Sequence, residues 1–285
     1  MDKFEGMAVV TVAMLLVVGV GAAMFYGQAE DAKDERDEMA VREWAYRSLM
    51  ALETDVQDEL VSASRNLTQA SLMLSGTGLN GTAARSIMND VLANVTNGIN
   101  VVTIDADGII VAAEPSSYRS VEGTDISDQT QVVKMLNNHL PVMSQVFQMV
   151  EGFMASDMEL PVFDGNGTFI GSISVTMDIE EIVRDKVEAL DLPSGFQVTC
   201  LQDDGLEVYD TDEGQIGRNL FTDPIYANYT ETLDFMHEML MSNNGYGTYE
   251  YYESLESQEP VTKEVYWSGI GMHGMSWTLM FIHVV

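Results

Sequence analysis

Polar side chains alternate along one predicted strand, and they are the strongest candidates for binding a small molecule. A strand over residues 168–178 places Ser172, Ser174, Thr176 and Asp178 on one face and the intervening residues on the other. The polar face either meets solvent or forms the floor of a pocket covered by helices. If Asp178 is buried there without a basic neighbour, it favours a cationic or amine ligand, because an unpaired buried carboxylate is costly.

Other residue types that carry chemistry lack the spacing that a reaction needs. Asp105 and Asp107, and the acidic run 210–213, suggest calcium, but neither continues into a twelve-residue loop with a distal Glu, and Asp107-Gly108 is explained by a turn. The four histidines show no metal-ligand spacing, and the sequence contains no recognisable catalytic triad, paired-acid or phosphate-loop arrangement. We therefore expect no enzymatic activity, no metal and no cofactor.

The charge balance limits the partners of this chain. Thirteen basic and 45 acidic residues give a net charge of −32, which excludes nucleic acid and anionic lipid surfaces because their phosphates would be repelled. An apolar content of 46% is ample for a folded body. The single cysteine, Cys200, lies in an apolar-leaning run without a basic neighbour, so we expect a buried structural thiol.

An uncharged run over residues 7–26 has the length of a helix that crosses a ~30 Å hydrocarbon core. It is longer than the apolar part of a signal peptide, so a retained transmembrane anchor is favoured over a cleaved leader. Lysine and arginine counts on its two sides do not decide its orientation. Five Asn-x-Ser/Thr sequons favour a glycosylated exterior, and hence a cytoplasmic segment 1–6 and an extracellular body on a single-pass cell-membrane anchor. These sequons begin at Asn66, Asn80, Asn94, Asn166 and Asn228.

A long amphipathic helix follows the anchor over residues 27–78. Its apolar residues recur every three or four positions, and Gly76 and Gly78 mark its end. The stripe either packs on sheets of the same chain, which is favoured because strands follow it, or forms the seam of a homodimer or larger homo-oligomer. The stripe consists of Leu49, Leu52, Val56, Leu60, Ala63, Leu67, Ala70 and Leu74.

The remaining sequence repeats one pattern twice. Residues 102–112 and 198–209 each have a strand, an Asp-Gly turn and a second strand, and each hairpin precedes a polar loop with glycine. A helical stretch and further strands follow each copy, and residues 179–190 form an amphipathic linker helix. The predicted class is α+β, with helices on small antiparallel sheets.

These motifs together resemble the double Cache extracellular sensor domains, in particular those of archaeal chemoreceptors and sensor kinases. The residues that carry the resemblance are the Asp-Gly hairpins, Gly123 and Asp125, the run 161–178, residues 209–217, and Trp267 with the segment 274–277. The resemblance implies two PAS-like modules on one long amino-terminal helix, a membrane-distal one at 79–185 and a membrane-proximal one at 186–285.

The resemblance also implies that the distal module binds a small molecule. Both faces of a PAS-like sheet are covered, which makes Asp178, Thr176 and Ser174 pocket candidates. Further walls are expected from Tyr118, Gln145, Phe147 and Met149.

Two departures from the family affect the expected function. Such receptors normally continue into a second transmembrane helix and an output domain, whereas this sequence stops at Val285, so we expect signalling through a separate partner or an oligomer. The amino-acid-binding branch carries an arginine before its last strands, whereas residues 142–153 contain no basic residue; only Asp178 matches that branch, where an acid holds the ligand's amino group. The sequence predicts a sensor of an amine or amino-acid-like ligand, and the alternative is a structural, pilin-like surface or filament subunit.

Overall fold

The computed structural model describes residues 3–149, 152–252 and 260–285, with the side chains of residues 1–32, 34 and 35 outside that description. The chain divides into two compact units, Met1–Arg47 and Ser48–Val285. Residues 3–47 belong to the first helix, α1 (Lys3–Thr77). Among the described residues, no helix combines the length and apolar character that a membrane span requires. The anchor predicted at 7–26 has side chains outside the described residues.

The second unit is built along the remaining part of α1. The predicted apolar stripe is buried, and each of its eight residues is at most 2% exposed, which confirms packing within the chain. Polar contacts join α1 to both sheets: Ser71 donates to the carbonyl of Pro161, and the Gln57 amide exchanges two hydrogen bonds of 3.1 Å with the backbone of Gly271. The helix ends where Gly78 adopts a φ of 78° and donates to the carbonyl of Leu74, as the glycine signal predicts.

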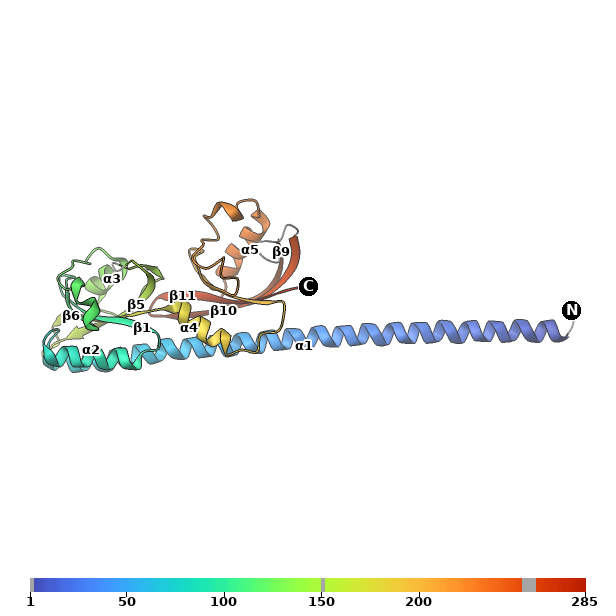
Figure 1. Ribbon diagram of the computed structural model, residues 1–285, viewed down its shortest axis with the longest axis horizontal. Coiled ribbons are helices and arrows are strands. Elements are labelled where there is room, and N and C mark those ends of the chain that lie inside the picture. Colours follow the sequence, from blue (N-terminus) through green and yellow to red (C-terminus); the bar gives the residue numbers. More distant parts are fainter. Residues whose placement is uncertain (1–2, 150–151, 253–259) are drawn as a thin grey trace. The chain divides into compact units, whose positions relative to one another are not determined.

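The first module contains an antiparallel sheet of strand order β2-β1-β6-β5-β3, with β4 also paired to β5 (Figure 1). Its strands are β1 (Gly98–Asp105), β2 (Ile110–Glu114), β3 (Val142–Met143), β4 (Phe147–Gln148), β5 (Met154–Phe163) and β6 (Phe169–Met177). Its helices are α2 (Thr82–Asn94), η1 (Ser116–Val121) and α3 (Thr130–Asn138).

The second module repeats this topology with the strand order β8-β7-β11-β10-β9. Its elements are β7 (Phe196–Gln202), β8 (Glu207–Asp210), η2 (Pro224–Tyr226), α5 (Thr230–Leu240), β9 (Asn244–Tyr252), β10 (Pro260–Met272) and β11 (Met275–Val284). Helix α4 (Ile179–Glu188) connects the sheets and contains the predicted boundary at 185/186. The two predicted hairpins and the α+β class with two antiparallel sheets are confirmed.

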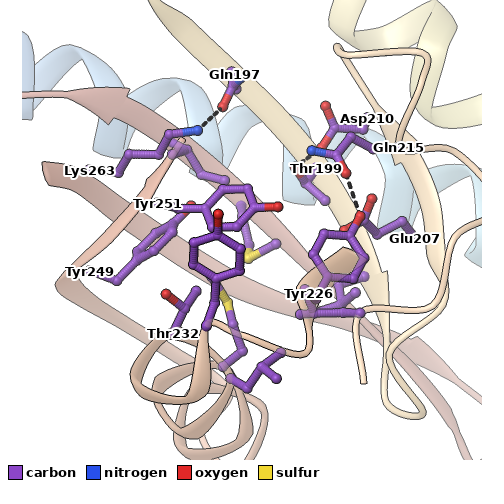
Figure 2. Close-up of a pocket in the computed structure, with 17 residues that line it drawn as sticks. Gln197, Thr199, Glu207, Asp210, Gln215, Tyr226, Thr232, Tyr249, Tyr251 and Lys263 are labelled. Carbon is purple, nitrogen blue, oxygen red and sulfur yellow. Dashed lines mark hydrogen bonds between the residues drawn. The ribbon is translucent and has the colours of Figure 1, made fainter. Parts of the chain in front are cut away.

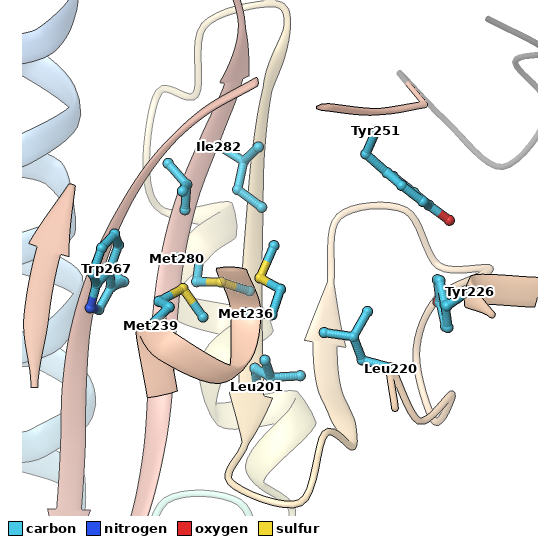
Figure 3. Packing of buried hydrophobic residues seen from close by; sticks show 10 residues of the cluster. Leu201, Leu220, Tyr226, Met236, Met239, Tyr251, Trp267, Met280 and Ile282 are labelled. Carbon is cyan, nitrogen blue, oxygen red and sulfur yellow. The ribbon is translucent and has the colours of Figure 1, made fainter. Parts of the chain in front are cut away.

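Each sheet has an apolar core on the face that carries its own short helices. In the first module, Val102 and Ile104 of β1 pack with Val132 of α3 and with the partly buried Tyr118 of η1. In the second module, Met236 and Met239 of α5 face Leu201 and Met280 of the sheet (Figure 3). Cys200 is fully buried, as expected, and burial raises the pKa of its thiol to about 12.

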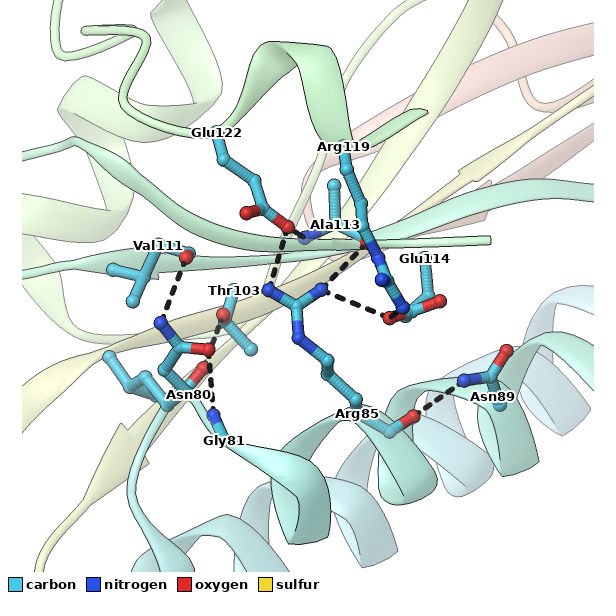
Figure 4. A network of polar contacts seen from close by, with 11 residues as sticks. Asn80, Gly81, Arg85, Asn89, Thr103, Val111, Ala113, Glu114, Arg119 and Glu122 are labelled. Atoms are coloured by element: carbon cyan, nitrogen blue, oxygen red, sulfur yellow. Dashed lines mark hydrogen bonds and ion pairs between the residues drawn. The ribbon is translucent and has the colours of Figure 1, made fainter. Parts of the chain in front are cut away.

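Helix α2, for which the sequence analysis predicts no element, is joined to the sheet by a charged network (Figure 4). Arg85 pairs with Glu114 at 3.0 Å and with Glu122 at 2.9 Å, and Arg119 also pairs with Glu114. Glu114 is only 3% exposed, and its two arginine partners hold the pKa of its carboxyl below the usual range despite the opposing effect of burial. The network closes one end of the first module around β2.

A buried glutamine joins the two modules. The Gln202 side chain of β7 accepts hydrogen bonds from the Val146 backbone at 2.7 Å and from the Trp277 indole at 3.3 Å. Val146 lies between β3 and β4 of the first module. A displacement of this segment would therefore act through Gln202 on strands β7 and β11 of the second sheet.

Candidate functional site

The polar face predicted on β6 extends across three adjacent strands. Thr176 lies opposite Asp157 of β5 on one side and opposite Asn100 of β1 on the other. Ser174 lies opposite Glu159 of β5 in the same way. Directly opposed residues share a face of the sheet, so one surface collects two carboxylates, two hydroxyl groups and an amide.

Some of these groups satisfy one another. The Thr176 hydroxyl lies 2.7 Å from Oδ1 of Asp157 and 3.0 Å from Oδ1 of Asn100. Ser172 donates to Oε1 of Glu159 at 2.5 Å. These bonds fix the side chains of Asp157 and Glu159 from the neighbouring strand β6.

Two buried oxygens on this face have no hydrogen-bond partner among the described residues. They are Oε2 of Glu159 and Oγ of Ser174, on side chains of residues that are 1% and 2% exposed. Burial, together with the charge of Asp157, raises the pKa of Glu159 to about 7, although Ser172 opposes the shift. Buried unpaired polar atoms are rare in native proteins, and a bound ligand is one physical reason for them.

Helix α3 covers this face and borders a cavity. Its Gln131 donates to Oδ2 of Asp157 at 3.3 Å, which places the amino-terminal end of the helix above the acids. Gln131 also lines a cavity of about 450 Å³, together with Lys134 of the same helix and Ser144, Gln145 and Phe147 of the β3–β4 segment. Gln131 thus links the cavity to the polar face, although Asp157, Glu159, Ser174 and Thr176 do not themselves line the cavity.

The predicted binding residues lie in several separate regions of the first module. Ser174 and Thr176 lie on the polar face, while Gln145 and Phe147 line the cavity. Oε1 of Gln145 is a further buried oxygen without a partner in the described part of the chain. Tyr118 packs on the apolar core of the first module, and Met149 is 6% exposed, with its N–H bonded to the carbonyl of Phe153.

Asp178 lies just beyond β6, which ends at Met177. Its carboxylate accepts the N–H of Glu181 at 3.0 Å and so caps α4. It lines a separate cavity of about 80 Å³ with Val146 and Met154. A role for Asp178 as a ligand contact stays a prediction.

Sequence reasoning missed Asp157, Glu159, Asn100 and Gln131. A signal was present for the first two, because the strand Met154–Phe163 places both acids at alternate positions, in the same period as the polar residues of β6. The pairing of β5 with β6 and of β6 with β1 was needed to bring them together.

The arrangement is suited to binding a small molecule. The buried Glu159 and the half-buried Asp157 attract a cation, and the hydroxyl and amide groups of the face orient hydrogen bonds. Among the described residues, no group of three or more metal-ligating side chains is placed to hold an ion.

The predicted glycosylation sites occupy two kinds of position. Asn80, Asn94, Asn166 and Asn228 are exposed. Asn66 is half-buried, and its amide donates to the carbonyls of Ser62 and Asn94. Glycosylation of these five residues stays a prediction.

The fold agrees with that of known sensor domains. Residues 58–178 match the family model described as HK/GC/chemotaxis protein-like, sensor domain. An extracellular ligand-binding receptor from Desulfohalobium retbaense DSM5692 is 32% identical, with a TM-score of 0.71. The match covers 84% of this chain and 40% of that receptor, so the chain spans less than half of its length. The comparison with curated proteins found no match.

More distant solved structures share the fold. The ligand-binding domain of the Pseudomonas aeruginosa PAO1 chemoreceptor PctB, in complex with L-Arg, is 12% identical with a TM-score of 0.61, and the match covers 86% of this chain and 95% of that one. The corresponding domain of PctC, in complex with GABA, is 14% identical with a TM-score of 0.58 and coverage of 84% and 98%. These similarities do not favour a structural filament subunit. Residues 58–178 therefore match a chemotaxis-type sensor-domain family, and the chain has the fold of Cache-type sensor domains, as its sequence motifs predicted.

Proposed function

We propose that this chain is a membrane-anchored sensor whose first module binds a small molecule with an ammonium group. The observation that carries the proposal is the pair of buried, unpaired oxygens of Glu159 and Ser174, opposed on adjacent strands beneath α3. An ammonium group supplies three donors and a positive charge, so it satisfies both oxygens and compensates the charge of Glu159 and Asp157.

The rest of the ligand would lie in the 450 Å³ cavity. This volume suits a molecule of amino-acid size, and Lys134 and Gln145 on its wall offer partners for a carboxylate or amide group. L-Arg and GABA, the ligands named for the PctB and PctC domains, both carry an ammonium group, which supports this ligand class.

The proposal includes the predicted topology. Residues 7–26 anchor the chain as a single transmembrane helix, residues 1–6 face the cytoplasm, and the first module is the membrane-distal one. A homodimer, or a separate signalling partner, would receive the signal through α1, whose apolar stripe contacts the body of the chain. Binding would change the packing beside this helix.

Three ligands of matched length test the chemistry. The full chain, purified in detergent, is titrated at pH 8 with butylamine, GABA or sodium butyrate, and the midpoint of thermal unfolding is followed. Butylamine and GABA are expected to stabilise the protein because each carries the ammonium group, whereas butyrate is expected to give no shift. Stabilisation by butyrate alone would contradict the proposal, as would the absence of a shift with all three ligands.

The Glu159→Gln variant tests the location. It keeps the shape of the side chain and removes the charge, so the affinity for butylamine is expected to fall about 10- to 100-fold, the usual value of a charge-assisted hydrogen bond. The control is Asp107→Asn, which removes an exposed carboxylate from the β1–β2 turn of the same module. Equal affinities in wild type and Glu159→Gln would place the ligand elsewhere.

A further inference from the structure

The second module contains its own polar pocket, on the face between its sheet and α5 (Figure 2). The cavity measures about 50 Å³ and takes its walls from β7, β8, β9, β10, β11, α5 and the segment 215–229. Figure 2 shows Lys263 and Gln197 on one side, and Glu207, Asp210 and Gln215 on the other. The two signs of charge therefore lie at opposite ends of one pocket.

One acid at the negative end has a free oxygen. Asp210 accepts a hydrogen bond from the hydroxyl of Thr199, and the charge of Lys263 also acts on it. Glu207 is 6% exposed, lines the pocket, and its Oε2 has no hydrogen-bond partner among the described residues. Lys263 donates to Gln197 at 2.8 Å at the other end, and within the described part of the chain Oε2 of Glu207 stays without a partner.

Burial and the charges around Glu207 set the pKa of its carboxyl. Burial, followed by the charge of Asp210, raises the pKa of its carboxyl to about 9. Asp212 acts in the same direction, while Arg218 and the nearby Tyr226, whose hydroxyl donates to Gln215, oppose the shift. Glu207 is consequently protonated at neutral pH, and a cation placed beside it would favour the ionised form.

Aromatic rings form the remaining walls. Tyr229 and Tyr251 meet edge to face with centroids 4.7 Å apart, and Tyr226 lies 6.2 Å from Tyr251. Figure 2 shows the Tyr226 ring next to Glu207. Aromatic faces attract organic cations, and a carboxylate beside them adds charge compensation. The cavity has room for about four water-sized groups, which limits the occupant to a few non-hydrogen atoms.

We propose that the second module binds a small, singly charged amine, with its ammonium group on Oε2 of Glu207 and its carbon atoms against the tyrosine rings. This site is separate from the one in the first module and uses none of its residues. The chain would then read two amine ligands, or one amine at two concentrations, through two sheets joined at Gln202.

Methylammonium chloride is the probe, compared with sodium chloride at the same concentration. The full chain is titrated at pH 8 as wild type, Glu207→Gln, Glu159→Gln and the double variant, and binding is measured by calorimetry. The Glu159→Gln variant isolates the second site, and methylammonium is expected to bind it at least tenfold more tightly than it binds the double variant. The control is Glu238→Gln, an exposed position on α5, which is expected to leave the affinity unchanged.

The pH dependence of binding provides a readout that does not rely on the Glu207→Gln variant. A cation competes with a proton for Glu207, so the affinity of the Glu159→Gln chain for methylammonium is expected to rise about tenfold per pH unit between pH 6 and 8. Binding of sodium with equal affinity would overturn the proposal, as would equal affinities of Glu159→Gln and the double variant. A flat pH profile would also contradict it. The two sites are tested separately: Glu159→Gln leaves only the second site, and Glu207→Gln leaves only the first.

Discussion

The two modules share a strand order and differ in where their polar side chains lie. The register makes positions comparable: Ser174 of β6 lies opposite Val102 of β1, and Met280 of β11 lies opposite Thr199 of β7. Ser174 and Met280 thus occupy equivalent places. In the first module the central strands carry the polar residues Asp157, Glu159, Ser174 and Thr176, whereas the equivalent residues of the second are Val265, Trp267, Met280 and Ile282.

The outer hairpin shows the opposite arrangement. In the second module it carries Glu207 and Asp210, where the first module has Ile110 and Ala113. Each sheet thus carries two acids under its helices, but on different strands; Glu159, Glu207 and Asp210 are buried and Asp157 is half-buried. The comparison shows that one topology can place a charged site at either side of the same face, so the fold fixes the covered surface and the side chains fix the chemistry.

The largest expected effect concerns Trp277, which is fully buried in β11. Trp277→Ala is expected to lower the free energy of unfolding by about 3–5 kcal/mol, because it removes a large buried ring. It also removes the donor to Gln202. Chemical denaturation checks the value, and a loss below about 1 kcal/mol would show that the ring is not a core element of the second sheet.

The two buried glutamates differ in the pH range over which they affect stability. Both folded pKa values are raised above the unfolded value, so the stability present below about pH 4.5 is lost as the pH rises. The loss is complete near pH 7 for Glu159 and continues to about pH 9 for Glu207. At pH 7, each Glu→Gln variant is expected to be about 3 kcal/mol more stable than wild type in the absence of ligand.

Denaturation of both variants at pH 5, 7 and 9 tests this difference. Between pH 7 and 9 only Glu207→Gln is expected to gain further on wild type. Identical profiles for the two variants would remove this distinction between the modules.

Gly171 of the first module occupies the place that Trp277 has in the second. Its φ is 136°, and a Cβ there would lie 2.0 Å from the carbonyl oxygen of Ile104. Gly171→Ala is expected to cost about 1–3 kcal/mol, because the backbone of β1 must shift. Thermal unfolding measures the change, with Gly165→Ala in the exposed turn, where a Cβ meets nothing within 4 Å, as the control. An unchanged midpoint in Gly171→Ala would contradict the close packing of β6 on β1.

The smallest expected effect separates the two arginines of the charged network. Arg119 is 46% exposed, so Arg119→Met is expected to cost less than about 1 kcal/mol. Arg85→Met should cost more, because Arg85 is 22% exposed and also holds Glu122 and the carbonyl of Ala113. Urea denaturation of the two variants compares them, and the reverse order would show that Arg119 is the main partner of Glu114.

Local patterns predicted most of the fold. The stripe from Leu49 to Leu74 follows from helical periodicity, and the Asp-Gly turns at Gly108 and Gly205 set both hairpins. Helix α2 was missed although its four buried residues, Ala84, Ile87, Met88 and Val91, have the i, i+3, i+4, i+7 spacing of an amphipathic helix.

The sites were less predictable than the fold. Ser174 and Thr176 were found from their alternation, but their partners Asp157 and Glu159 depend on which strands pair, which a local pattern does not state. Asp178 is a residue type that often contacts ligands. It lies directly before α4, where its carboxylate accepts a capping hydrogen bond. In the second module, Glu207 becomes part of a pocket only when α5 and β9 close over it.

Proton release on ligand binding tests the central claim, that Glu159 holds an ammonium group, most directly. Butylamine is titrated into the Glu207→Gln chain at pH 7 by calorimetry in two buffers with different heats of ionisation. Because the pKa of Glu159 is about 7, the account predicts that about half a proton is released per bound ligand. It also predicts that Glu159→Gln abolishes the release. Binding without proton release, or release that persists in Glu159→Gln, would contradict the account.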